Sequence, residues 1–179
     1  MSRGKTKAII VSKFSIHLNP KTLRLILNLK SLHYKYNFKQ QKKWFNKNIN
    51  KKDLHNLVYY KKSLIGYNCL RNLRIMKVNN KKVGKVKLFD TLVFKPNYRG
   101  RGFSDILLKK NIAQLNKTKL IGLLYCKKNM LGYYKKYNWI RVRKNQVLFD
   151  EVSKKNLFPM LFNNKNFDIK KISIKVSKI

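Results

Sequence analysis

The spacing of apolar residues predicts helices near the N-terminus and mostly strands after them. Leu23, Ile26 and Leu27 recur at the three- and four-residue spacing of an amphipathic helix. Asn37 is a favourable N-cap for a second helix. The pattern therefore predicts two helices, over residues 21–33 and 38–49.

Runs of β-branched, aromatic and other apolar residues predict the strands. Strands are expected at residues 8–11 or 14–18, 54–60, 64–70, 85–94, 120–126, 140–143 and 169–176. Lys61, Lys62 and Ser63 would join two of them in a hairpin, although this turn has no glycine. Five further segments have weaker patterns. Residues 71–77 are expected to extend the preceding strand or form another, 79–84 to form a loop, and 129–137 to form a short helix. Residues 146–149 are expected to pair with the strand at 140–143, and the pattern over 154–162 is ambiguous.

A basic turn follows the strand that ends at Phe94, and a helical pattern begins again over residues 105–116. Two of the chain's seven glycines, Gly100 and Gly102, lie in this turn. Glycine adopts positive φ readily and lets an anion approach the backbone. The first N–H groups of a helix lack internal partners, and the helix dipole adds positive charge there. The turn is therefore predicted to hold a phosphate group.

The charge of the chain is strongly positive. Lysine and arginine total 44 against six acids, which gives a formal net charge of +38 over 179 residues. A nucleic-acid partner would explain this charge. So would compositional bias, because lysine is spread over the whole length of a chain that is also rich in asparagine and isoleucine. Either way we expect non-specific binding to polyanions at low salt.

Other sequence features narrow the class of protein. The length favours one domain over residues 1–179. Cys69 and Cys126 stand far apart, which argues against a zinc site or a disulfide framework and suits a reducing compartment. Cys126 ends an apolar strand and is expected to pack in the core. The apolar run at residues 8–11 is too short for a signal peptide, and no apolar run is long enough to span a membrane, so a cytoplasmic protein is expected.

The glycine turn and a tyrosine-rich segment together resemble the GNAT N-acetyltransferase superfamily. The family's central motif is Arg or Gln, two residues, Gly, one residue, then Gly or Ala, between a strand and a helix. Arg99 and Gly102 fit this motif, and Ser104 stands at its last position. Downstream, residues 132–139 resemble the family's tyrosine-containing helix and turn, with Asn138 in place of the usual glycine. The resemblance covers roughly residues 54–143.

This resemblance implies an α+β fold. The family has a mixed, mostly antiparallel central sheet flanked by helices, with two splayed parallel strands at its centre. Here those two strands would be residues 88–94 and 120–126. The helices over residues 21–49 would precede the core at 54–143, and further strands would follow over 144–179.

The resemblance also implies acetyl-CoA as cosubstrate. The turn would hold the pyrophosphate, and the strand before it would pair its backbone with the pantetheine amides. The cofactor-binding residues implied are Leu92, Val93, Phe94, Arg99, Gly100, Arg101, Gly102, Phe103, Ser104 and Asn129.

For catalysis, the resemblance implies direct attack of a primary amine on the thioester. The N–H group of Phe94 would stabilise the oxyanion, and Tyr134 would protonate the leaving thiolate. Asp90 lies on the same side of its strand as Leu92 and Phe94 by the two-residue period, and is a candidate general base or acceptor anchor. The alternatives are aromatic packing for Tyr134 and an ion pair with a lysine for Asp90.

The amine acceptor is left open: a small molecule, an amino sugar or a protein amino group would each serve. Transfer of a longer acyl group is also open, as is the choice between monomer and homodimer. The second hypothesis is a basic RNA- or ribonucleoprotein-binding module that keeps the fold without turnover. Aromatic residues interleaved with lysine would then stack on bases, as in Tyr34-Lys35-Tyr36 and Lys43-Trp44-Phe45.

Overall fold

The protein is described by a computed structural model covering residues 8–78, 85–149, 156–162 and 174–178. These residues form two compact units. Unit 1 is the described part of residues 1–70 and 91–110, and unit 2 is that of residues 71–90 and 111–179. The expectation of a single domain stays a prediction.

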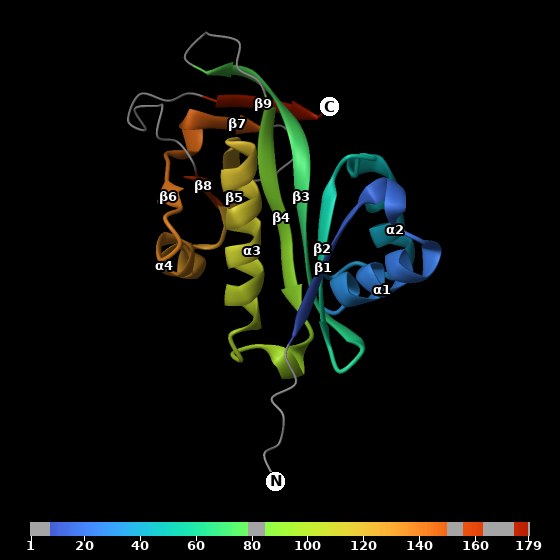
Figure 1. Cartoon of the computed structure of the whole chain (residues 1–179). Coiled ribbons are helices and arrows are strands. Elements are labelled where there is room, and N and C mark those ends of the chain that lie inside the picture. The colour runs from blue at the N-terminus through green and yellow to red at the C-terminus, as the bar shows by residue number, and fades with distance from the viewer. Residues whose placement is uncertain (1–7, 79–84, 150–155, 163–173, 179) are drawn as a thin grey trace. The chain divides into compact units, whose positions relative to one another are not determined.

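The elements follow one another as Figure 1 labels them. Unit 1 contains β1 (Ile9–Phe14), η1 (Ser15–His17), α1 (Pro20–Ser31), α2 (Phe38–Asn48), β2 (Leu54–Tyr60) and η2 (Pro96–Tyr98). Elements that run through both units are β3 (Ser63–Val78), β4 (Lys85–Phe94) and α3 (Phe103–Thr118). Unit 2 contains β5 (Ile121–Cys126), η3 (Lys128–Met130), α4 (Leu131–Lys135), β6 (Ile140–Arg141), η4 (Lys144–Gln146), β7 (Val147–Phe149), β8 (Phe158–Phe162) and β9 (Ile174–Lys178).

Asparagine caps begin both N-terminal helices. The Asn19 side chain accepts the N–H of Thr22 at 2.8 Å, and Pro20 occupies the first turn of α1. Asn37 and Gln40 form a capping box at α2, with bonds of 3.0 and 2.9 Å. Both predicted helices and the predicted Asn37 cap are therefore confirmed.

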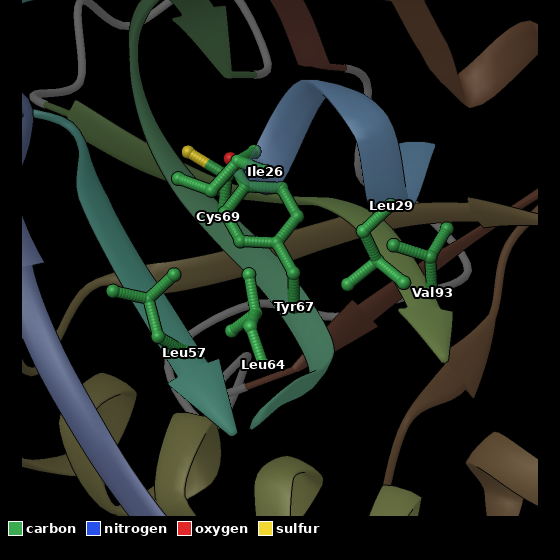
Figure 2. Close-up of a cluster of buried hydrophobic side chains, with 7 residues drawn as sticks. All are labelled: Ile26, Leu29, Leu57, Leu64, Tyr67, Cys69 and Val93. Carbon is green, nitrogen blue, oxygen red and sulfur yellow. The ribbon is translucent and has the colours of Figure 1, made fainter. Parts of the chain in front are cut away.

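Unit 1 packs helices on both faces of its strands. β1 pairs antiparallel with β2, and β2 with β3. The N–H of Lys95 donates to the carbonyl of Ile65 at 2.8 Å, which ties the end of β4 to β3. Figure 2 shows the cluster on the face covered by α1: Ile26, Leu29, Leu57, Leu64, Tyr67, Cys69 and Val93. The second cluster consists of Val58, Ile65 and Phe94 from the strands and Leu107 from the first turns of α3.

Unit 2 has the mixed sheet that the family resemblance implies. β4 and β5 are parallel, and so are β7 and β9, whereas β5 with β8, β6 with β8, and β3 with β9 are antiparallel. The β4–β5 ladder runs from Val86 opposite Ile121 to Leu88 opposite Leu123, and both strands continue beyond it. The expected fold class, a mostly antiparallel mixed sheet flanked by helices, is confirmed.

Several local predictions were wrong or incomplete. Residues 15–17 form the 3₁₀ helix η1, so the alternative strand at 14–18 is wrong and β1 is the N-terminal strand. β7 pairs with β9, whereas the partner of β6 is β8. These pairings join residues far apart in sequence, which no local pattern specifies. The hairpin turn is Lys61 and Lys62 alone, because Ser63 begins β3, and residues 71–77 extend that strand. The expected loop at 79–84 and residues 169–173 lie outside the described residues.

A buried polar group lies at the centre of unit 1. His55 is 0% exposed, with Nε2 2.7 Å from the Ser15 hydroxyl and Nδ1 2.8 Å from the Tyr67 hydroxyl. Phe45 stacks on the same ring at 5.7 Å. Burial, helped by the nearby charge of Lys30, lowers the pKa of His55 from 6.5 to about 4. The folded protein therefore holds His55 neutral at neutral pH.

The lowered pKa predicts acid sensitivity between pH 6.5 and pH 4. Below pH 6.5 the unfolded chain protonates His55 while the folded chain does not, so unfolding becomes easier as pH falls. The loss reaches at most about 3.5 kcal/mol, at roughly 1.4 kcal/mol for each unit of pKa difference. Urea unfolding at several pH values should show this decline in the wild type and in the exposed control His17→Gln. A decline that persists unchanged in His55→Gln would contradict the assignment.

Candidate functional site

The basic turn begins where β4 ends. Gly100 and Gly102 have φ values of +71° and +76°, as the sequence predicted for these two positions. A Cβ atom at either position would meet nothing within 4 Å. Both glycines are therefore required by the left-handed backbone and not by close packing.

Four successive backbone N–H groups in the turn are available to an anion. The N–H groups of Asp105 and Ile106 both donate to the Gly102 carbonyl, at 3.1 and 3.4 Å. Within the described part of the chain, the N–H groups of residues 101–104 have no hydrogen-bond acceptor. Helix α3 begins at Phe103, two residues before the predicted start, so these donors lie at its N-terminus, where the dipole is positive.

Arg99 and Arg101 do different things in the structure. The Nε of Arg99 donates to the Phe94 carbonyl at 3.2 Å, which closes the turn back on the end of β4. The Arg101 guanidinium lies 5.6 Å from the centre of the Tyr98 ring. The sequence predicted a charge at both positions but not the structural bond of Arg99.

Three aromatic rings pack together beside the turn. The ring centroids of Tyr60, Tyr98 and Phe103 lie 5.4 to 6.2 Å apart, in tilted and edge-on arrangements. Tyr60 comes from the end of β2, about forty residues away in sequence. Sequence reasoning did not identify it, because no local signal connects the two segments.

The last residues of β4 alternate between the faces of unit 1. Val93 packs on the α1 side, whereas Leu92 and Phe94 pack on the α3 side. The Phe94 ring lies directly against Gly66, where a Cβ atom would overlap it. Sequence reasoning missed Gly66, although a glycine inside a strand is itself a signal of close approach.

A backbone irregularity separates Asp90 from these residues. Thr91 has φ +57°, which is unusual for a β-branched residue and interrupts the strand. Leu88 and Phe89 are neighbours in sequence and both are buried, so buried and more exposed positions do not alternate there either. The two-residue period that placed Asp90 on the side of Leu92 therefore does not run unbroken.

Asp90 forms an ion pair in unit 2. Its Oδ2 lies 3.4 Å from Nη1 of Arg71, whose side chain is buried. The prediction that Asp90 forms an ion pair is thus confirmed, but its partner is an arginine and not the expected lysine. The carboxylate of Asp90 has a positively charged neighbour in Arg71. Its role in catalysis stays a prediction.

Tyr134 is held in an aromatic cluster of unit 2. It is 6% exposed, and its ring centroid lies 6.0 Å from that of Phe89 and 6.4 Å from that of Trp139. Asn138, at φ +62°, follows this helical segment and takes the left-handed backbone expected of the usual glycine. Asn129 lies on η3 and is exposed. The predicted 129–137 helix is therefore η3 followed by α4, and packing alone does not decide the role of Tyr134.

The aromatic residues proposed to stack on bases are mostly occupied within unit 1. The Lys30 ammonium lies 3.8 Å from the Trp44 ring centroid, and Phe45 stacks on His55. Lys30 also lies 5.9 Å from the ring centroid of Tyr34, while Tyr36 is exposed. These contacts favour packing as the role of Trp44 and Phe45.

Cys126 is a buried thiol. Its Sγ lies 3.8 Å from the Met160 sulfur, and burial raises the pKa of the thiol to about 11. Cys69 is buried in unit 1. Across the described ranges there is no group of His, Cys, Asp and Glu side chains that would hold a metal ion. None of the helices described is long and apolar enough to cross a membrane.

Comparisons with known proteins identify the fold. No protein-family model matches the sequence, and no curated protein does either. An acyl-CoA N-acyltransferase from Pseudomonas aeruginosa is similar in structure, with a TM-score of 0.64, 17% identity, and coverage of 87% of this chain and 99% of that one. Naa50 from Arabidopsis thaliana, solved with the bisubstrate analogue CoA-Ac-MVNAL, has a TM-score of 0.61 and 17% identity, with coverage of 86% of this chain and 97% of that one. The N-acetyltransferase YlbP from Bacillus subtilis, in complex with coenzyme A, has a TM-score of 0.56 and 14% identity, with coverage of 87% of this chain and 96% of that one.

The chain has the GNAT fold. Within that fold, the glycine turn lies between β4 and α3, and Tyr134 lies on α4 after β5. The order strand, turn, helix, strand, tyrosine helix is the one that the sequence motif predicted.

The glycine turn predicts a stability difference between two kinds of glycine. Gly100→Ala and Gly102→Ala should each lower the free energy of unfolding by about 1 kcal/mol, because a Cβ disfavours positive φ. Gly132 is the matched control: it is helical, and a Cβ there also meets nothing within 4 Å. Gly132→Ala should therefore raise stability by up to about 1 kcal/mol. Urea unfolding measures all three, and equal losses at all three positions would contradict the backbone explanation.

The buried thiols predict slow alkylation. In a Cys69→Ala variant, Cys126 should react with N-ethylmaleimide at pH 7.5 much more slowly than it does in urea, because little thiolate forms and access is restricted. Mass spectrometry over time follows the reaction. Modification of the native protein as fast as that of the unfolded chain would show that the thiol is accessible.

Proposed function

We propose that this protein is an N-acetyltransferase of the GNAT superfamily that moves an acetyl group from acetyl-CoA to a primary amine. The observation that carries this proposal is the run of four N–H groups at residues 101–104 that find no acceptor among the described residues, at the start of α3 in a chain with the GNAT fold. A pyrophosphate is the anion whose size and charge suit such a run at a helix N-terminus.

Each part of the turn has a role in holding the cosubstrate. The N–H groups of residues 101–104 would bind the pyrophosphate, and Gly100 and Gly102 would give them their direction. Arg101 supplies positive charge, and Arg99 adds charge while fixing the turn to Phe94. The backbone of Leu92, Val93 and Phe94 would pair with the pantetheine arm. Asn129, exposed on η3, would add a polar contact.

The chemistry asks for three groups. The N–H of Phe94 would stabilise the oxyanion as the amine attacks the thioester carbonyl. The Tyr134 hydroxyl would give its proton to the leaving thiolate. Asp90 would attract the acceptor's ammonium group and take its proton. Its carboxylate lies 3.4 Å from Nη1 of Arg71, so the acceptor's ammonium group would share it with that guanidinium.

The acceptor is a primary amine whose further identity is not assigned. The Arabidopsis Naa50 structure holds an analogue that joins coenzyme A to a peptide, so peptide amines are among the candidates to test. The RNA-binding module without turnover is the competing function. The packing of Trp44 and Phe45 inside unit 1 favours the enzyme.

Replacing Tyr134 tests the enzyme directly. Release of free coenzyme A is measured with acetyl-CoA and a panel of amines that includes polyamines, amino sugars and peptides. Tyr134→Phe should lower kcat by about 10²-fold or more, with little change in KM for acetyl-CoA, because only the proton donor is lost. Tyr133→Phe removes a neighbouring hydroxyl, 5.2 Å away between ring centroids, and should leave kcat within a few-fold.

Two results would sink this proposal. One is the absence of turnover with every amine together with no rise in melting temperature in saturating acetyl-CoA. A ligand at a hundredfold excess over its Kd should stabilise the fold by about 2.7 kcal/mol. The other is an equal loss of kcat in Tyr133→Phe and Tyr134→Phe, which would make the effect one of aromatic packing.

A further inference from the structure

The hairpin turn between β2 and β3 is built from two lysines in an unfavourable conformation. Tyr60 pairs with Ser63, so the loop contains only Lys61 and Lys62. Their φ values are +47° and +62°, which is the signature of a type I′ turn. Such turns strongly favour Asn-Gly, because residues with a Cβ resist positive φ. A strained pair of this kind is a reason to look for a function at the turn.

A cavity of about 520 Å³ lies next to this turn, entirely within unit 1. Leucines of α1 and of its C-cap supply the apolar side: Leu25, Leu29 and Leu32. Lysines from the hairpin and from the end of β4 supply its charged side: Lys61, Lys62 and Lys95. We call this surface the lysine-turn groove. Its size lies in the range of ordinary ligand sites.

The apolar side of the groove reaches beyond the core. Leu29 is buried in the cluster of Figure 2, whereas Leu25 is 40% and Leu32 is 58% exposed. Leu25 lies on α1 and Leu32 is its C-cap residue, still in the αR conformation, so their seven-residue spacing places both on one side of the helix, about 10 Å apart. A single exposed leucine needs no explanation, but this pair borders a cavity.

The lysines of the groove are not neutralised by the carboxylates that the structure describes. Lys95 donates to the Ser63 hydroxyl at 2.9 Å, and the Lys61 ammonium lies 5.8 Å from the Tyr60 ring centroid. Both partners are neutral. Lys61, Lys62 and Lys95 form no ion pair with any carboxylate that the structure describes. The groove therefore presents positive charge that attracts a negatively charged partner.

We propose that the lysine-turn groove docks an acidic polypeptide segment that also carries apolar side chains. Its carboxylates would meet Lys61, Lys62 and Lys95, and its apolar side chains would cover Leu25 and Leu32. A peptide fits better than a small anion, because the exposed Leu25 and Leu32 offer apolar surface beside the lysines that a small anion would leave uncovered. It also fits better than nucleic acid, whose phosphates would use the lysines but leave the leucines uncovered. The proposal does not depend on acyl transfer.

The turn itself supplies a sharp test. Lys61→Asn/Lys62→Gly introduces the favoured type I′ pair and removes two charges. The melting temperature should rise, while the Kd for a fluorescein-labelled peptide Glu-Glu-Leu-Glu-Glu-Leu-Leu-Glu should increase at least tenfold. Fluorescence anisotropy with the full chain at 150 mM salt measures the binding. Because stability and binding move in opposite directions, a damaged fold cannot imitate the result.

Two matched variants complete the experiment. Lys42→Gln/Lys43→Gln removes the same charge from exposed positions on α2 and should leave the Kd within twofold. Leu25→Gln/Leu32→Gln keeps the charge and should weaken peptide binding at least fivefold, without weakening binding of a single-stranded RNA oligonucleotide.

Three outcomes would overturn the proposal. Equal weakening by the α2 and hairpin variants would show that net charge alone binds the peptide. An unchanged peptide Kd in Leu25→Gln/Leu32→Gln would show that the leucines do not contact the peptide, and would favour a site for nucleic acid. A fall in melting temperature for Lys61→Asn/Lys62→Gly would show that the lysine turn is not strained.

Discussion

The close approach of Phe94 to Gly66 is the constraint on which the functional part of unit 1 depends. The ring needs the space that a side chain at residue 66 would fill. The Lys95 N–H bonds to Ile65 beside it, and the Arg99 side chain returns to the Phe94 carbonyl. Together these contacts fix where β4 stops, and so where the glycine turn and helix α3 begin.

Local patterns in the sequence predicted what local physics determines. The Asn37 cap and the positive φ values at Gly100 and Gly102 depend on residues within a few positions of one another. The site's supports join distant segments instead. The Tyr60 ring beside Phe103, the Arg71 partner of Asp90, and the pairing of β7 with β9 depend on tertiary packing, for which the sequence carries no periodic signal.

The positive side chains of this chain are accommodated largely by neutral partners. Lysine ammonium groups contact aromatic rings and neutral oxygens: Lys30 lies over the Trp44 ring, and Lys95 donates to the Ser63 hydroxyl. Asp53 is buried, and its carboxylate accepts the Asn50 N–H at 2.8 Å. Cation–π contacts and bonds to neutral oxygens tolerate an excess of lysine, because they do not require one acid for each base. The net charge alone therefore says little about a partner, whereas the placement of three lysines beside exposed leucines says more.

The two tryptophans of the chain fall one in each unit. Trp44 lies half-buried beneath the Lys30 ammonium in unit 1, whereas Trp139 is fully enclosed in unit 2, between Phe89, Tyr134 and Phe162. Their emission therefore comes from two different electrostatic surroundings. With either indole replaced by phenylalanine, intrinsic fluorescence reports on one unit at a time. The chain thus carries its own pair of optical probes for asking whether its two units open together or separately.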